Sequence, residues 1–260
     1  MSGLSLTLGG ANVIMQLSRL PVGHGVAEST VESGSLHVHP IKRTRTTLGY
    51  IMIALFGTDH ERDAMRGEVN GQHRYVRSNP ESPVVYSAFD PELQLWVAAC
   101  MYRGLEEAGS FLYGEEFLAT LDALYGHCAR FATTLQVPAS MWPENREAFE
   151  SYWSIALQHV MMDDVTRSYL YGLASLHFLP RPLRVLFGRP HRFITSGFLP
   201  TRFREELGLE WDDRHQRWFN VLRTLLAWTN RVLPRRVREF PWNVVLWDTR
   251  ARIRKGRRIV

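Results

Sequence analysis

The residues best placed to do chemistry are one histidine and a short polar run upstream of it. On a 3.6-residue period, Met65, Val69, His73 and Val76 form one stripe, so a single imidazole lies on an apolar helix face. A neutral imidazole nitrogen is a good ligand for a transition metal, and an apolar slot suits a planar cofactor. A lone histidine on such a stripe can also be a hydrogen-bonded core residue. The pattern alone leaves both interpretations open.

The polar run lies on the preceding segment, residues 41–57. Arg43, Thr47 and Tyr50 share one helical face, and Thr46 lies beside them. Guanidinium and hydroxyl groups can stabilise negative charge on dioxygen or bind the carboxylates of a cofactor. The alternative is a solvated helix start, because basic and hydroxyl residues alternate at the beginning of this segment.

Two facing helices would position these groups. The first runs from Ile41 to Gly57, a glycine in the place expected just after a helix C-terminus. The second opens at the N-capping pair Thr58 and Asp59 and reaches about Arg77. We expect this pair of helices to hold a planar cofactor between them.

Four blocks of sequence carry a resemblance to a known family. They are Arg43-x-x-Thr46-Thr47-x-x-Tyr50, then Phe56-Gly57, then His73, then Tyr86-x-Ala88-x-Asp90-Pro91-x-Leu93-x-x-Trp96-Val97. Together they resemble the rubber oxygenase/MpaB family (DUF2236), which includes the latex clearing proteins. The resemblance implies an all-α, globin-like domain that carries haem b, with a histidine as the proximal iron ligand. It also implies oxidative chemistry, which in characterised members is cleavage of carbon–carbon double bonds in isoprenoid chains.

The resemblance assigns roles to the residues above. His73 is expected to bind the iron, and Arg43, Thr46 and Thr47 are expected to form the catalytic group. The expected cofactor contacts are His73, Arg43, Tyr50, Val69 and Val76. The second ring nitrogen of His73 should meet a carbonyl or a carboxylate.

Two departures from the family pattern bear on activity. Rubber-cleaving relatives have a lysine before the distal threonine, whereas Thr46 stands there in this chain. Many relatives have a histidine directly after the Trp-Val pair, where this chain has Ala98. The first departure weakens an inference of polyisoprene cleavage, and the second leaves His73 as the candidate ligand.

Composition and charge limit the number of domains and the kinds of partner that the chain can have. The 260 residues are 45% hydrophobic and 22% charged, and no boundary is visible, so we expect one domain, 1–260. The formal net charge is +5, and residues 250–260 hold six basic side chains and no acid. This tail could make a weak peripheral contact with an anionic membrane, or it could be a solvated helix end. It lacks interleaved aromatic residues, so no nucleic acid partner is expected.

Cysteine usage and hydropathy indicate a compartment. Cys100 and Cys128 belong to no CxxC pair, which excludes a disulfide scaffold and a zinc site. No apolar run approaches the ~20 residues needed to cross a bilayer, and the N-terminus lacks a signal-peptide pattern. We therefore expect a soluble, cytoplasmic protein.

The remaining helix signals predict roughly eight to eleven helices and no strands. The expected helical segments are 4–20, 90–107, 114–135, one opening at 143–147, 168–178, 181–187, 203–207 and 212–232. Prolines 180 and 190 should divide the short helices, and residues 28–40, with His37 and His39, should form a surface loop. Trp242 and Trp247 are expected to anchor the C-terminus.

The motifs that would indicate other enzyme classes are missing. The sequence contains no GxGxxG, P-loop, GxSxG or helical ExxH pattern. Two hypotheses remain, with a helical protein that has lost its cofactor as a third. The first is a haem b-dependent oxygenase that uses dioxygen on an apolar small-molecule or polymeric substrate, isoprenoid- or lipid-like. The second is a non-catalytic protein of the same fold that binds haem or an apolar ligand.

Overall fold

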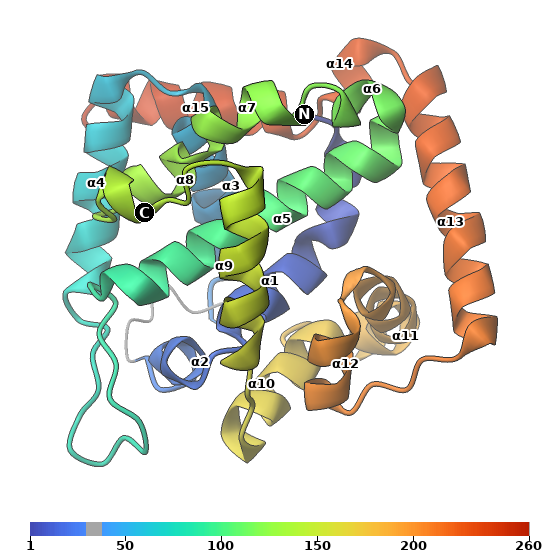
Figure 1. The fold of residues 1–260 in the computed structure, drawn as a ribbon, viewed down its shortest axis with the longest axis horizontal. Coiled ribbons are helices and arrows are strands. Elements are labelled where there is room, and N and C mark those ends of the chain that lie inside the picture. The colour runs from blue at the N-terminus through green and yellow to red at the C-terminus, as the bar shows by residue number, and fades with distance from the viewer. Residues whose placement is uncertain (30–37, 260) are drawn as a thin grey trace.

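The computed structural model describes residues 1–29 and 38–259, and the regular secondary structure of these residues is helical (Figure 1). The α-helices are α1 (Gly9–Leu17), α2 (Leu20–Ala27), α3 (Pro40–Phe56), α4 (Asp59–His73), α5 (Pro91–Tyr113), α6 (Glu115–Leu118), α7 (Leu121–Cys128), α8 (Arg130–Thr133), α9 (Arg146–Gln158), α10 (Asp164–Ala174), α11 (Arg181–Phe198), α12 (Thr201–Leu207), α13 (Asp213–Val232), α14 (Arg235–Arg238) and α15 (Trp242–Arg254), with 3-10 helices η1 (Gly3–Leu8) and η3 (Ala139–Met141). The all-α prediction is confirmed. The helices outnumber the eight to eleven expected, partly because α6, α8 and α14 are single turns.

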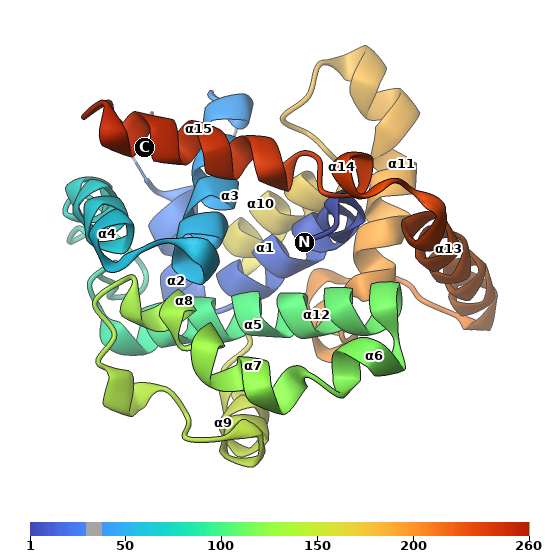
Figure 2. The ribbon, with the colours of Figure 1, turned by 90° about the horizontal axis from the view of Figure 1, so that it is seen from above.

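Helix α5 runs through the middle of the fold and organises the core (Figures 1 and 2). Its N-cap is Asp90, whose carboxylate accepts a hydrogen bond of 2.8 Å from the amide of Glu92. Trp96 on α5 is fully buried, stacks on Trp153 with ring centroids 5.2 Å apart, and donates from Nε1 to the carbonyl of Gln16 at 3.0 Å. Asp90 therefore caps α5, and Trp96 fixes α5 in the core.

The expected pair of helices is present as α3 and α4. Thr58 and Glu61 form a capping box at the start of α4, with the Glu61 amide donating to the Thr58 hydroxyl at 3.2 Å and the Thr58 amide donating to Glu61 at 2.9 Å. Helix α4 ends at His73 instead of near Arg77 as expected. The chain turns there and Arg77 pairs with Ser87 in an isolated antiparallel bridge, which removes Val76 from the helical stripe.

Two other helix boundaries differ from the expectation. The segment 114–135 is broken into α6, α7 and α8, and the Thr120 hydroxyl at the first break donates to the carbonyl of Phe117 at 2.7 Å. Pro190 does not end a helix, because α11 continues through it. Tertiary contacts on both sides hold α11 there: Gly188 lies against the backbone of Ser175, and His191 bonds the carbonyl of Ala174 at 2.8 Å.

The C-terminal helix α15 packs across α3, as Figure 2 shows. Trp242 is 3% exposed and donates to the carbonyl of Ser2 at 2.9 Å, so the prediction of an anchor is confirmed there. The same prediction for Trp247 is wrong, because its side chain is 67% exposed. Thr249 is the residue that meets α3, where Gly49 lets the two helices approach closely.

No helix in the described part of the chain combines the length and the apolar character needed to cross a bilayer. The predicted loop 28–40 lies largely outside the described residues, and His37 is one of the residues outside them. His39 is exposed at the start of α3.

Candidate functional site

Arg43 lies within electrostatic reach of an imidazole and of a phenol, each on another helix. Arg43 lies near the start of α3, His73 is the last residue of α4, and Tyr169 lies on α10. Burial and then the charge of Arg43 lower the pKa of His73 to about 4. Burial raises the pKa of Tyr169, and the charge of Arg43 opposes that rise. Arg43 is therefore near both His73 and Tyr169, and the roles of Arg43 and His73 in a site stay a prediction.

His73 has the properties of a ligand side chain. Its Nδ1 atom is buried and has no hydrogen-bond partner among residues 1–29 and 38–259. A buried polar atom without a partner costs free energy, and a bound metal ion would offset that cost. The lowered pKa keeps the imidazole neutral at physiological pH, with a lone pair available for a metal. The ring also meets Phe89 edge-on, with centroids 6.3 Å apart.

Arg43 carries a guanidinium that solvent reaches. Its side chain is exposed, and the protein around it lowers its pKa by burial. A guanidinium is a strong donor to a carboxylate or to a developing negative charge.

The other predicted site residues differ in what their polar atoms do. Thr46 is buried and its hydroxyl donates to the carbonyl of Lys42 at 3.0 Å, so that proton is already used inside α3. Tyr50 is buried and donates to the carbonyl of Phe131 at 2.6 Å, and burial raises its pKa. Thr47 is half-buried one residue after Thr46. The hydroxyl of Thr47, unlike that of Thr46, donates no hydrogen bond within α3.

The two apolar residues predicted to line the cofactor have separate surroundings. Val69 on α4 is partly buried against the hydrophobic core. Val76 follows the end of α4 and lies over Gly25 of α2, close to Tyr86. Val69 therefore keeps its place on the face of His73, whereas Val76 reaches this region from a loop.

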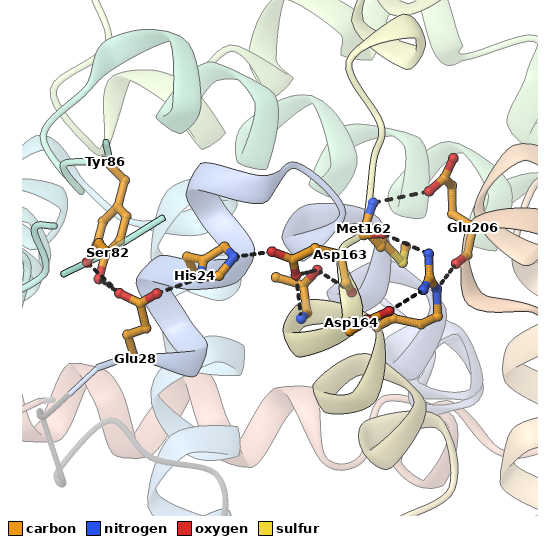
Figure 3. Close-up of polar contacts among 10 residues, drawn as sticks. His24, Glu28, Ser82, Tyr86, Met162, Asp163, Asp164 and Glu206 are labelled. Carbon is orange, nitrogen blue, oxygen red and sulfur yellow. Dashed lines mark hydrogen bonds and ion pairs between the residues drawn. The ribbon is translucent and has the colours of Figure 1, made fainter. Parts of the chain in front are cut away.

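Sequence reasoning missed a second histidine, which is buried between two carboxylates (Figure 3). His24 on α2 is 1% exposed; its Nδ1 lies 2.5 Å from Glu28 and its Nε2 lies 2.6 Å from Asp163. Burial disfavours the charged ring, but the hydrogen bonds that the ring donates to Asp163 and Glu28 outweigh that effect and raise the pKa of His24. Glu28 also accepts from Ser82 at 2.7 Å and from Tyr86 at 3.0 Å. The sequence signal for this cluster is weak, since its members are far apart along the chain.

The His24 cluster positions the elements that carry the site. Asp163 is the N-cap of α10 and accepts from the amide of Thr166 at 2.9 Å, so the cluster fixes the helix that presents Tyr169. Ser82 and Tyr86 belong to the loop that follows His73. We therefore regard His24 as a positioning residue, because its contacts join α2, α10 and this loop.

Replacing His24 by leucine is expected to lower the free energy of unfolding by about 2 to 3 kcal/mol, because two carboxylates lose a charged partner. His24, whose pKa is raised above 6.5, contributes fully below that pH and loses its contribution as the pH rises through the folded pKa. Burial raises the pKa of Asp163, but hydrogen bonds from Thr166 and His24 outweigh burial and lower this pKa to about 2, so the contribution of Asp163 is lost as the pH falls from 3.8 toward 2. The difference in stability between the two proteins should be largest between the titration of Asp163 and that of His24, and it should shrink both below and above that range.

Urea unfolding from acid to alkaline pH measures this deficit. The control is His127→Leu, which removes one bond of 2.6 Å to the carbonyl of Leu55 from an exposed side chain and should cost about 1 kcal/mol or less. An equal loss for both variants, or a deficit for His24→Leu that does not change with pH, contradicts a charged His24.

The rest of the described chain offers no competing metal centre. No group of three or more His, Cys, Asp or Glu side chains that could hold an ion occurs among residues 1–29 and 38–259. Cys100 and Cys128 are buried free thiols, and burial raises the pKa of each. Neither cysteine is therefore a reactive thiolate at neutral pH.

The comparisons with known proteins point to an oxygenase. The profile of the family described as ER-bound oxygenase mpaB/B'/Rubber oxygenase, catalytic domain, matches residues 1–228. An uncharacterized protein of Mycobacterium bovis and one of Mycobacterium tuberculosis are each 48% identical over 255 residues, which is 98% of this chain and 100% of each relative. No solved structure matches. The match spans α1 to α12 and most of α13, including every candidate site residue, and the chain belongs to the mpaB/rubber oxygenase family.

Proposed function

We propose that the protein is a haem b-dependent oxygenase that uses dioxygen to oxidise an apolar, isoprenoid- or lipid-like substrate. The observation that carries this proposal is the buried Nδ1 of His73, which has no hydrogen-bond partner in the described part of the chain and belongs to a neutral imidazole within electrostatic reach of Arg43. The oxygenase family supports the reaction class. Haem b, when bound, supplies an iron that activates dioxygen, and the residues around it supply binding, orientation and charge.

His73 would hold the iron. Its environment suits this role, because an imidazole with a pKa of about 4 presents a free lone pair throughout the physiological range. The apolar residues on the same stripe of α4 are Met65, which is fully buried, and Val69, which packs against the core. They exclude water from the side of the ring that faces the helix.

Arg43 and Thr47 would act as donors on the opposing helix. The guanidinium can bind a haem carboxylate or stabilise negative charge on the oxygen being reduced. Tyr169 lies within reach of the charge of Arg43 and would help to orient it. Thr46 would have a mainly structural role in α3, because its hydroxyl already donates to the carbonyl of Lys42.

A second candidate function is binding without turnover. The observation that favours it is Thr46, which stands where rubber-cleaving relatives have a lysine. Such a protein would carry or sense haem or an apolar ligand through the same residues.

Oxygen uptake separates the two candidates. Purified protein loaded with hemin and given a chemical reductant is expected to consume dioxygen with unsaturated lipids, carotenoids or polyisoprene, well above an equal concentration of free hemin. The oxidised product should appear by mass spectrometry. Stable haem binding with uptake no greater than the hemin control would support the binding protein instead.

A further inference from the structure

Helix α13 carries apolar side chains on two different faces. Its inner face packs on the core through Phe219, which is 2% exposed, and through a hydrogen bond of 3.2 Å from Asn230 to the carbonyl of Leu112 on α5. Its outer face carries five large apolar residues that are each 55–62% exposed: Trp218, Val221, Leu225, Trp228 and Val232. Spacings of three and four residues place these five side chains in one stripe.

Both views show α13 at an outer edge of the fold (Figures 1 and 2). The stripe therefore faces outward, away from α5. Soluble monomers rarely expose a contiguous apolar patch of this kind, and such a patch marks a binding surface. Two exposed tryptophans in one stripe are typical of the boundary between lipid and water, where an indole ring has both apolar and polar neighbours.

The charges around the stripe are almost all positive. Arg214 and Arg217 near one end and Arg231 near the other are exposed and form no ion pair among the described residues. From residue 213 to residue 239, which covers α13 and α14, the chain holds seven arginines against two acids, Asp213 and Glu239. Glu239 is already paired with Arg235. The partner of the stripe must therefore be apolar and anionic at once.

We propose that the outer face of α13 binds the surface of an anionic lipid bilayer, with the helix lying in the interface and the arginines on lipid phosphates. An amphipathic helix with this distribution of Trp, aliphatic and Arg side chains binds in this way, through buried apolar area and attraction to anionic lipid. A second copy of the chain is a poor partner, because it would bring two sets of unpaired arginines together. The proposal rests on α13 and the arginines that flank its stripe, and it is independent of haem.

Vesicle binding tests the proposal on the whole chain. We expect the protein to sediment with phosphatidylcholine vesicles that contain about one third phosphatidylglycerol and to stay in solution with phosphatidylcholine alone. Added salt should release it, and the fluorescence of Trp218 and Trp228 should shift to the blue on binding. Replacing both residues, Trp218→Ser and Trp228→Ser, should weaken partitioning at least about tenfold.

Two further variants make the test specific. Neutralising the arginines, with Arg214→Gln, Arg217→Gln and Arg231→Gln, should also weaken partitioning at least about tenfold. The matched control is Ile155→Ser with Val165→Ser, which removes apolar side chains that are 60% and 54% exposed on α9 and α10 and should bind as the unaltered chain does. Thermal melting of each variant shows that it is folded.

Three results would overturn the proposal. The first is no binding to either kind of vesicle, and the second is equal binding to neutral and anionic vesicles. The third is a dimer of the unaltered chain in analytical ultracentrifugation that the two tryptophan substitutions convert to a monomer, since the stripe would then be an interface between copies.

Discussion

Replacing His73 by alanine is expected to abolish tight haem binding while leaving the fold intact. Loss of a residue that hydrogen-bonds to a metal ligand already lowers metal affinity roughly 10- to 100-fold. Loss of the ligand itself should lower the affinity for haem by more. The fold should tolerate the change, because the variant removes a buried nitrogen that has no hydrogen-bond partner. Hemin titration followed in the visible spectrum measures the affinity, and urea unfolding of the haem-free protein measures the stability.

The control for this variant lies on the same helix. His60 is exposed near the start of α4, so His60→Ala should bind hemin as the unaltered chain does. Added imidazole should restore part of the spectrum of His73→Ala, since it can occupy the space left by the side chain. A His73→Ala protein with unchanged affinity and spectrum would show that another group holds the iron.

Replacing Arg43 by methionine is expected to lower the rate of dioxygen uptake about 100-fold while haem still binds. Removing one donor from a site where negative charge develops typically costs ~10²- to 10³-fold in turnover. Methionine keeps much of the volume of the arginine and removes its charge. Uptake of dioxygen with the best substrate of the panel measures the rate, and the visible spectrum measures haem occupancy.

Arg45→Met is the matched control for Arg43→Met. Residues two apart on a helix face different ways, so this variant removes a neighbouring charge from a different face of α3. It should retain most of the activity. A rate for Arg43→Met equal to that of Arg45→Met would place Arg43 outside the chemistry. Complete loss of haem from Arg43→Met would instead assign its charge to cofactor binding.

The sequence predicts local features of the site well. Helices α3 and α4 form where the periodicity, Gly57 and the Thr58 capping box place them, because these signals act within a few residues. The same local chemistry predicts the start of α5 at Asp90. The pairing of Arg43 with His73 follows once these helices are placed against each other.

Features that depend on contacts between residues far apart along the chain could not be predicted from the sequence. Helix α4 ends early because the bridge of Arg77 with Ser87 draws the chain away, and α11 passes through Pro190 because α10 holds it. His24 lies 139 residues from Asp163 along the chain, so no motif contains both. Tyr169 enters the site only because α10 packs where it does.

The expectation that Trp242 and Trp247 both anchor the C-terminus is confirmed for Trp242 and wrong for Trp247, for a related reason. Periodicity shows that a tryptophan shares a face with other apolar residues, but not whether protein covers that face. Trp242 is covered by the N-terminal segment, whereas Trp218 and Trp228 on α13 have no such cover. A helix with two apolar faces looks in sequence like a helix of the core.

The measurement that tests the central claim most directly is the visible spectrum of the pure protein during titration with hemin. The account predicts a Soret band distinct from that of free hemin, which grows until one haem is bound per chain. A titration that never departs from the spectrum of free hemin would contradict the assignment of His73 as an iron ligand, and with it the proposed oxygenase chemistry.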